Sequence, residues 1–388
     1  MVERELQPTV IELARTYPVI TITGPRQAGK TTLARMAFPS YAYCNLEHPE
    51  TRLLAQQDPR GFFNHYKPPL VIDEVQRVPQ LLSYIQVLVD ERRENGMYVL
   101  TGSQQLNLNE SITQSLAGRT ALVTLLPFTI GEVEAIQSAQ AMRDDLLYKG
   151  FLPRIYDQAQ NPTIAYRNYL QTYIERDVRQ LINLRDLSVF EKFLRLLAGR
   201  AAQLLNLSSL ASDTGVSANT ISNWLSILET SYVIFRLQPY YENLGKRLIK
   251  SPKMYFVETG LLCYLLGIEN QQQVTRDPLL GNLFENMVVA ESLKNRLNMG
   301  LGPNLYFYRD SHHNEVDLIY RMGNSLVPIE IKAAMTYNSE LIKGIKRFQA
   351  LTQSQGPGFL VYGGNMSYTL SEPIRILGFR HIPSIFSL

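Results

Sequence analysis

The chain has 388 residues, which is longer than one typical domain and indicates two or three. Its 38 Lys and Arg against 35 Asp and Glu leave a net charge of +3, so any nucleic-acid surface must be a local patch. Cys44 and Cys263 lie far apart without metal-ligand spacing, which argues against a zinc site or a disulfide framework and favours the cytoplasm. The charged N-terminus argues against secretion, and the lack of a long apolar run argues against membrane spanning.

The first motif follows the apolar run VITIT at residues 19–23, which has the pattern of a strand buried on both faces. The next residues, GPRQAGKTT, fit the phosphate-binding pattern GxxxxGK[ST], and residues 30–38 suit a helix. In this motif the loop amides hold phosphate oxygens, the lysine reaches the β- and γ-phosphates, and the hydroxyl of Thr31 binds Mg²⁺. An ordinary Gly-rich turn is the alternative. The residues expected to bind ATP are Gly24, Pro25, Arg26, Gln27, Ala28, Gly29, Lys30, Thr31 and Thr32.

A second apolar strand at residues 70–72 ends at Asp73 and Glu74, which resembles a Walker B motif. We expect Asp73 to hold Mg²⁺ through water and Glu74 to be the base that polarises the attacking water. An Asp-Glu pair alone usually belongs to a solvated loop. Its place at the carboxyl end of a buried strand favours the catalytic interpretation.

The third strand, at residues 97–103, ends in a polar run that resembles sensor 1 of AAA+ ATPases. Ser103 is the favoured contact to the γ-phosphate or water and Gln104 the second, with a helix cap and turn as the alternative. Arg119 precedes a further apolar strand, where AAA+ proteins commonly place an arginine that reaches the neighbouring subunit's nucleotide. A surface arginine near a helix end is the alternative. Alternating strands and helices indicate a parallel sheet with the nucleotide at its carboxyl edge.

The middle of the chain, residues 132–200, is mostly amphipathic helix and fits a lid on the ATPase core. Arg176 and Arg179 in this stretch could sense nucleotide, but pairing with neighbouring acids on an exposed helix face is favoured. Residues 207–240 have a helix-turn-helix pattern, in which Ser208 or Ser209 is expected to cap the first helix.

Residues 233–257, VIFRLQPYYENLGKRLIKSPKMYFV, have the pattern of the two strands and tip of a wing. The second helix would present a polar face to the DNA major groove, and the tip would contact phosphates. A protein-docking winged helix is the alternative. The residues expected at DNA are Ser217, Asn219, Thr220, Asn223, Lys246, Arg247 and Lys250.

The last third contains a second group of charged residues. Glu285 lies on an expected helix, and Asp317, Glu330 and Lys332 lie on the two arms of an expected hairpin. Two carboxylates beside a lysine can hold Mg²⁺ and activate water, with Glu285 completing the metal shell. This arrangement resembles the PD-(D/E)xK nuclease core, and a charged sheet edge is the alternative.

Nearly the whole chain resembles bacterial and archaeal AAA-type ATPases whose P-loop module precedes a domain of unknown function with winged-helix and PD-(D/E)xK-like parts. The motifs that carry the resemblance are GPRQAGKTT, LVIDEVQ, LTGSQ, SLAGR followed by LLPF, GNLFEN, EVDLI and IEIKAA. The resemblance implies an α/β fold: an AAA+-like P-loop NTPase sheet, a helical lid, a winged helix and a restriction-endonuclease-like α/β domain. The expected segments are 1–135, 136–200, 201–255 and 256–388, in that order.

From these features we expect an ATPase that hydrolyses ATP with Mg²⁺ and couples nucleotide state to a C-terminal module that binds nucleic acid, with DNA favoured. That module carries the candidate nuclease site. No membrane partner is expected, and the AAA-type resemblance allows a homo-oligomer. The alternative is an ATP-dependent signalling switch whose winged helix and nuclease-like fold are non-catalytic binding surfaces.

Overall fold

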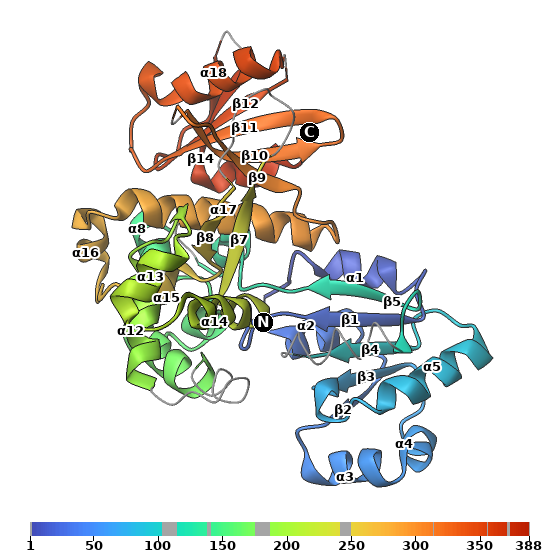
Figure 1. Ribbon diagram of the computed structural model, residues 1–388. Helices are drawn as coiled ribbons and strands as arrows, with labels where there is room; N and C mark the ends of the chain where they lie inside the picture. The colour runs from blue at the N-terminus through green and yellow to red at the C-terminus, as the bar shows by residue number, and fades with distance from the viewer. Residues whose placement is uncertain are drawn as a thin grey trace. The chain divides into compact units, whose positions relative to one another are not determined.

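The computed structural model describes residues 2–102, 115–137, 141–174, 187–240, 250–312, 314–354, 356–370 and 373–387. The chain divides into two compact units (Figure 1). The first comprises Met1–Phe128, Thr230–Tyr232 and Leu297–Leu301, and the second Thr129–Glu229, Val233–Arg296 and Gly302–Leu388. These units are coarser than the four segments expected from the sequence, whose boundaries stay predictions.

The first unit is built on a five-stranded sheet with the order β2-β3-β4-β1-β5 (Figure 1). Each neighbouring pair is parallel, as the sequence pattern predicts. The carboxyl ends of the strands therefore share one edge of the sheet. The strands are β1 (Val19–Thr23), β2 (Ala42–Asn45), β3 (Leu70–Asp73), β4 (Tyr98–Thr101) and β5 (Thr120–Thr124).

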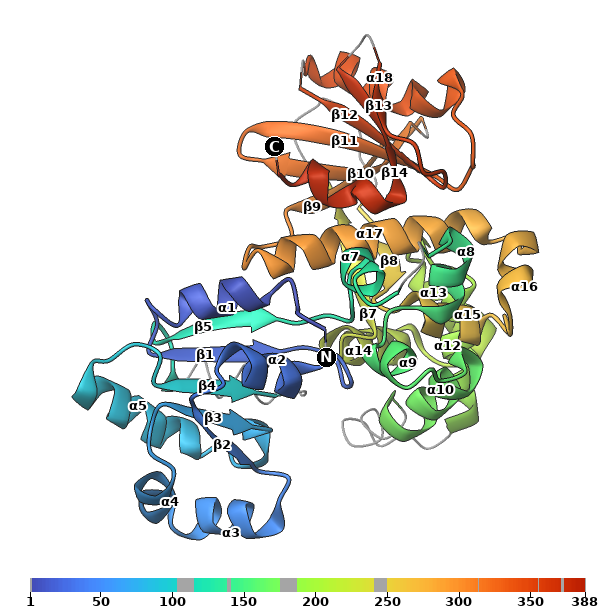
Figure 2. The ribbon, with the colours of Figure 1, turned by 180° about the vertical axis from the view of Figure 1, so that it is seen from behind.

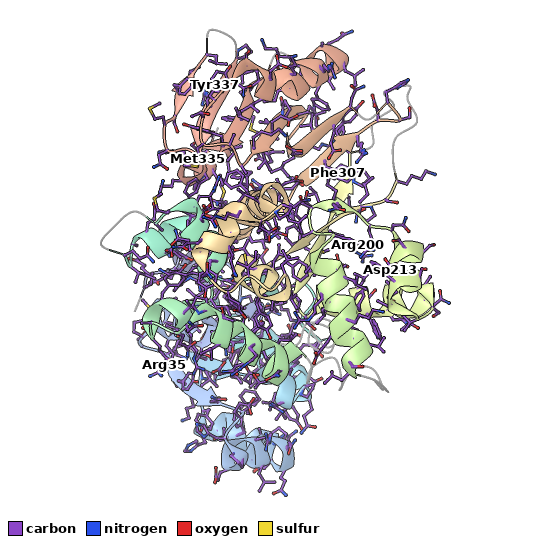
Figure 3. All side chains as sticks on the ribbon, turned by 90° about the vertical axis from the view of Figure 1, so that its left-hand side faces the viewer. Arg35, Arg200, Asp213, Phe307, Met335 and Tyr337 are labelled. Carbon is purple, nitrogen blue, oxygen red and sulfur yellow. The ribbon has the colours of Figure 1, made fainter. Side chains whose placement is uncertain are left out.

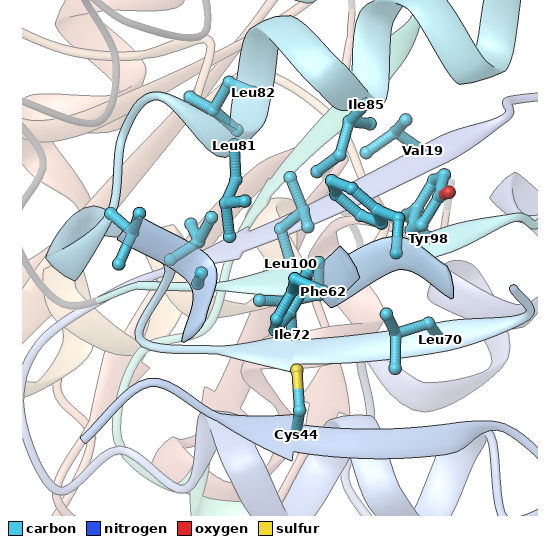
Figure 4. Packing of buried hydrophobic residues seen from close by; sticks show 14 of the residues in the cluster. Val19, Cys44, Phe62, Leu70, Ile72, Leu81, Leu82, Ile85, Tyr98 and Leu100 are labelled. Carbon is cyan, nitrogen blue, oxygen red and sulfur yellow. The ribbon is translucent and has the colours of Figure 1, made fainter. Parts of the chain in front are cut away.

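Both faces of the sheet are buried along its three central strands, since successive side chains point to opposite faces and every residue of β1, β3 and β4 is buried. Leu70 and Ile72 of β3 pack into one apolar cluster with Phe62 and Leu100, which Figure 4 shows from close by. Val71, between them, packs into the cluster on the other face. The helical segments of this unit are α1 (Gln7–Leu13), α2 (Lys30–Ala37), α3 (Pro49–Gln57), α4 (Pro59–His65), η1 (Val75–Arg77) and α5 (Leu81–Arg92).

The second unit is built on a nine-stranded sheet with the order β13-β14-β12-β11-β10-β9-β7-β8-β6. Strand β7 pairs with β8 in antiparallel and with β9 in parallel fashion. The strands expected for the wing and for the nuclease-like part therefore belong to one sheet. The strands are β6 (Gln203–Leu204), β7 (Ile234–Pro239), β8 (Lys253–Phe256), β9 (Leu305–Arg309), β10 (Glu315–Met322), β11 (Ser325–Lys332), β12 (Gly358–Tyr362), β13 (Tyr368–Thr369) and β14 (Ile374–Gly378).

The remaining helical segments follow Phe128, and α18 among them packs on β10 and β11 (Figure 2). None of those in the described ranges is long and apolar enough to span a bilayer. They are α7 (Ile130–Glu134), α8 (Arg143–Lys149), α9 (Pro153–Asp157), α10 (Pro162–Tyr169), η2 (Leu170–Ile174), α12 (Leu187–Ala198), α13 (Leu207–Thr214), α14 (Ala218–Thr230), α15 (Thr259–Leu265), α16 (Gln271–Arg276), α17 (Leu280–Asn298), η3 (Ser339–Ile342), α18 (Lys343–Thr352) and η4 (Phe379–Ile385).

The pair α13 and α14 has the helix-turn-helix order expected from the sequence, with Gly215 in the left-handed conformation between them. The cap of α13 differs from the prediction. Asn206, and neither Ser208 nor Ser209, precedes the helix in an extended conformation, and its side chain accepts a hydrogen bond from the Ser209 amide at 3.0 Å. Figure 3 shows Asp213 of α13 beside Arg200, with which it forms an ion pair.

Candidate functional site

The loop between β1 and α2 depends on its two glycines. Gly24 has φ +141° and Gly29 has φ +91°, values that L side chains rarely adopt. A Cβ on Gly24 would lie 2.0 Å from the carbonyl oxygen of Leu125, so the loop packs directly on the chain beyond β5. Lys30 begins α2 and is 7% exposed. Its ammonium group donates to the carbonyl oxygens of Gly24 at 2.9 Å and Pro25 at 2.7 Å.

Burial lowers the pKa of Lys30 to about 8. The ammonium is therefore held by loop carbonyls within a desolvated site, where a phosphate would be a stronger partner.

The acidic end of β3 meets this loop. The Asp73 carboxylate accepts a hydrogen bond from the Thr31 hydroxyl at 2.8 Å and another from the Tyr43 hydroxyl at 2.9 Å. The hydroxyl of Thr101, at the end of β4, donates to the other carboxylate oxygen. Burial and the neighbouring Asp73 raise the pKa of Tyr43 well above its usual value. Tyr43 and Thr101 were not among the predicted site residues, although each lies at or near the carboxyl end of a strand that neighbours β3.

Glu74 follows Asp73 in an unusual backbone conformation. Its φ of +58° lies in the left-handed region, which costs an L residue about 1–2 kcal/mol. Its amide donates to the Thr101 hydroxyl at 3.3 Å, and its carboxylate accepts from the Gln76 amide group at 2.5 Å. The contact with Gln76, which the sequence did not single out, holds the proposed base beside the strand end.

Arg119 lies at the opposite edge of the same sheet. Its carbonyl accepts from the amide of Val19, the first residue of β1, whereas the phosphate-binding loop leaves the last residue of that strand. The guanidinium forms two hydrogen bonds with Asp90 on α5, at 2.7 and 2.8 Å. Arg119 therefore does not join Thr31 and Asp73 within one chain.

Some predicted residues lie outside the described residues, so their structural roles stay predictions. They are Ser103, Gln104, Arg176, Arg179, Lys246 and Arg247.

The second group of predicted residues meets on the β10–β11 hairpin. The Lys332 ammonium lies 2.8 Å from the Asp317 carboxylate and 2.7 Å from that of Glu330. Asp317 also accepts from the Ile331 amide at 2.9 Å. A cavity of about 750 Å³ opens onto this trio and onto α18. Gly344 of α18 packs against Glu330, because a Cβ at that position would lie 1.9 Å from its carboxylate oxygen.

The electrostatics of this trio separate the two acids. Burial and the charge of Asp317 raise the pKa of Glu330 to about 8. Burial alone would also raise the pKa of Asp317, but the ammonium groups of Lys332 and Lys253 outweigh it and hold that pKa below its usual value. Burial opposes the charge of Lys332, yet the two carboxylates raise its pKa above the ordinary value. Asp317 is therefore ionised beside the charged Lys332, whereas Glu330 is readily protonated.

Glu285 of α17 lies near the trio but has other partners. Its carboxylate accepts from the Lys253 ammonium at 2.9 Å and from the Tyr255 hydroxyl at 2.7 Å. Lys253, which is 3% exposed, also forms an ion pair with Glu315 at 2.6 Å. In the part of the chain that the structure describes, no three His, Cys, Asp or Glu side chains are arranged to hold one metal ion. The predicted three-carboxylate shell is thus not assembled.

Mg²⁺ prefers oxygen ligands and binds through one or two carboxylates plus phosphates and waters. In the first unit the Thr31 hydroxyl and the Asp73 carboxylate are adjacent and fit this ion together with a nucleotide. In the second unit Asp317 and Glu330 supply two carboxylates beside a cavity large enough for water. That donor set fits Mg²⁺ without Glu285.

Comparisons with known proteins agree with this geometry for the first unit. An AAA domain matches residues 16–134. Two domains of unknown function match later parts of the chain, DUF8612 over residues 141–272 and DUF4143 over residues 280–382.

Among solved structures, a Walker-type ATPase of Pyrococcus abyssi aligns with a TM-score of 0.45 and 13% identity, over 68% of this chain and 96% of that one. AMPPCP-bound DnaA from Aquifex aeolicus aligns with a TM-score of 0.31 and 15% identity, over 58% of this chain and 86% of that one.

Sequence relatives cover much more of the chain. An uncharacterized protein of Mycobacterium tuberculosis is 34% identical over 364 residues, which span 92% of this chain and 79% of the relative. An uncharacterized protein of Mycobacterium bovis matches equally well. One of Haemophilus influenzae is 23% identical over 85% of this chain and 86% of its own length. The protein therefore belongs to the family of these mycobacterial proteins, and its first unit is an AAA-type ATPase domain with the α/β fold of a P-loop NTPase.

Proposed function

We propose that the protein hydrolyses ATP with Mg²⁺ and uses nucleotide state to control a C-terminal module that acts on nucleic acid. The observation that carries the first part is the 2.8 Å contact between Thr31, on the phosphate-binding loop, and Asp73, at the end of β3. A glycine-dependent loop, a buried lysine and a carboxylate converge on one point there. Binding of a triphosphate with its metal ion needs this set of groups.

The residues have distinct roles in this proposal. Lys30 exchanges its carbonyl partners for phosphate oxygens, and the loop amides bind the same phosphates. Thr31 and Asp73 would hold Mg²⁺, which neutralises charge on the phosphates when bound. Glu74 orients the attacking water and accepts its proton once Gln76 releases the carboxylate.

The DNA part of the proposal depends on the exposed face of α14. Ser217, Asn219 and Asn223 are exposed on or beside this helix, and the Ser217 hydroxyl caps it by accepting from the Thr220 amide at 3.1 Å. Small polar side chains at the start of a second helix suit contacts with base edges in a major groove. Lys250, at the expected wing tip, is exposed and suits a phosphate contact.

The nuclease part depends on the β10–β11 trio. Asp317 and Glu330 would hold Mg²⁺, which polarises a phosphodiester when bound, while Lys332 orients the attacking water beside Asp317.

In the proposed ATPase, Arg119 would contact the nucleotide of a neighbouring subunit. This contact needs a homo-oligomer in which the ion pair between Arg119 and Asp90 opens.

A non-catalytic switch is the second candidate, and a specific observation favours it. The three carboxylates of the C-terminal cluster are each paired with a lysine, since Lys332 pairs with Asp317 and Glu330, and Lys253 pairs with Glu285. A site whose carboxylates already have cationic partners can be a binding surface without cutting.

The ATPase proposal is tested by replacing Lys30 with Ala and titrating the full-length chain with a fluorescent ADP in the presence of Mg²⁺. We expect affinity to fall at least about tenfold, because a charge-assisted contact to phosphate is lost. Lys67→Ala, an exposed lysine of the same unit, is the matched control and should bind like wild type. Equal affinity for wild type and Lys30→Ala would refute the site.

The nuclease proposal is tested by incubating the protein with single- and double-stranded DNA and RNA in Mg²⁺ or Mn²⁺. Asp317→Asn and Lys332→Met should abolish any cleavage that wild type shows, whereas Lys343→Met on the surface of α18 should not. Nucleotide-dependent DNA binding without cleavage would favour the switch. Cleavage that survives both substitutions would place the activity elsewhere.

A further inference from the structure

Arg4 precedes α1 and reaches into the phosphate-binding loop. The residue is 4% exposed, although arginine is rarely buried. Its guanidinium donates to the carbonyl oxygen of Ala28 at 2.6 Å and to that of Leu126 at 2.8 Å. It also lies over the ring of Phe128, 4.9 Å from the centroid. The matched AAA region begins only at residue 16, so Arg4 lies outside it.

We infer that Arg4 is a positioning residue that sets the phosphate-binding loop in its binding-competent conformation. The inference rests on the proposed ATP binding. The peptide joining Ala28 and Gly29 is trans, and a trans peptide points its carbonyl and its N–H in opposite directions. Because Arg4 holds the Ala28 carbonyl, the Gly29 N–H is directed away from the guanidinium. Gly29 is the N-cap of α2, where free amides bind phosphate.

Without Arg4, the peptide between Ala28 and Gly29 loses the contact that fixes its orientation. Glycine at φ +91° places little steric restraint on that rotation. A rotated peptide would direct its carbonyl oxygen toward the phosphate and repel it. Loss of Arg4 should therefore lower the affinity for the phosphates, although every group that contacts them is still present.

The same guanidinium joins the loop to the end of the ATPase domain. Its partners Leu126 and Phe128 lie at the end of the segment Met1–Phe128, where the chain leaves the first unit. Gly24 at the other end of the loop already packs on Leu125. The planar fork of arginine can bond two carbonyls at once, which the single ammonium of lysine on a flexible stem does less well.

The test compares binding of fluorescent ADP with Mg²⁺ by full-length wild type, Arg4→Ala, Arg4→Lys and the control Arg15→Ala, an exposed arginine of the same unit. Affinity should fall roughly 10- to 100-fold in Arg4→Ala, because two hydrogen bonds from a charged group are lost. Arg4→Lys should lie between Arg4→Ala and wild type, and Arg15→Ala should match wild type. Millimolar guanidinium should restore much of the affinity of Arg4→Ala but none of that lost in Lys30→Ala.

The outcomes separate the two proposals. Wild-type affinity in Arg4→Ala, together with a loss in Lys30→Ala, would overturn the role of Arg4 and leave the nucleotide site intact. No binding by wild type would overturn the nucleotide site itself. If Arg4→Ala does not fold, wild-type affinity in Arg4→Lys would still overturn the inference, and reduced affinity with an unchanged unfolding temperature would support it.

Discussion

Replacing Lys253 with Met should lower the free energy of unfolding of the second unit by about 3–5 kcal/mol, the usual result of removing one partner from a buried ion pair. Lys253 is 3% exposed and holds Glu285 at 2.9 Å and Glu315 at 2.6 Å. Met has a similar shape and fills the space, so the loss measures Glu285 left without its cation and Glu315 left with Arg309.

The assay is urea unfolding followed by tryptophan fluorescence. The chain has one tryptophan, Trp224, which is buried in α14 within the second unit, so the signal reports on that unit. The matched control is Lys343→Met, because Lys343 pairs with Glu340 where both side chains are exposed, at 58% and 68%. That pair should contribute only about 0–1 kcal/mol.

A second substitution tests the cause of the loss. Glu285→Gln in the Lys253→Met background should restore part of the stability, because it removes one unpaired charge while the Tyr255 hydroxyl can still donate to the amide oxygen. Equal unfolding midpoints for Lys253→Met and Lys343→Met would refute the reasoning. So would a double variant less stable than Lys253→Met alone.

Three further predictions concern the first unit. Gly24→Ala should abolish nucleotide binding, since its Cβ would lie 2.0 Å from the Leu125 oxygen. The control is Gly118→Ala, because a Cβ at Gly118 would have no described atom within 4 Å. This variant should bind nucleotide normally, and its φ of +73° should lower the free energy of unfolding by about 1–2 kcal/mol. Glu74→Gln should slow ATP hydrolysis about 10²- to 10⁴-fold with little change in affinity, and an unchanged rate would contradict its role as base. Cys44, 3% exposed with its pKa raised by burial to about 12, should react with a thiol reagent only on unfolding; rapid labelling of the native chain would contradict its burial.

Local sequence patterns predicted the elements of the ATPase domain well. The β-branched run at residues 19–23 forms β1, and the helix expected from Lys30 begins at that residue. The cap of α13 shows the limit of such reasoning, since Asn206, Ser208 and Ser209 are all good capping residues and only the path of the chain selects among them.

The partners of the site residues could not be predicted in this way. Tyr43 and Thr101 reach Asp73 because β2 and β4 flank β3, an order that no local pattern specifies. Lys253 lies within the segment expected to form the wing, yet its partners are Glu285 of α17 and Glu315 of β10, which belong to the segment expected to be nuclease-like.

The sequence by itself determined the AAA-type loop, its lysine and the acidic strand end, because glycine geometry and apolar runs act within a few residues. Only the tertiary structure decided which groups surround them. Arg4 and Ala28 are 24 positions apart, and Asp317 and Lys332 are 15 apart. Such contacts depend on strand order and register, which arise from the packing of the whole sheet.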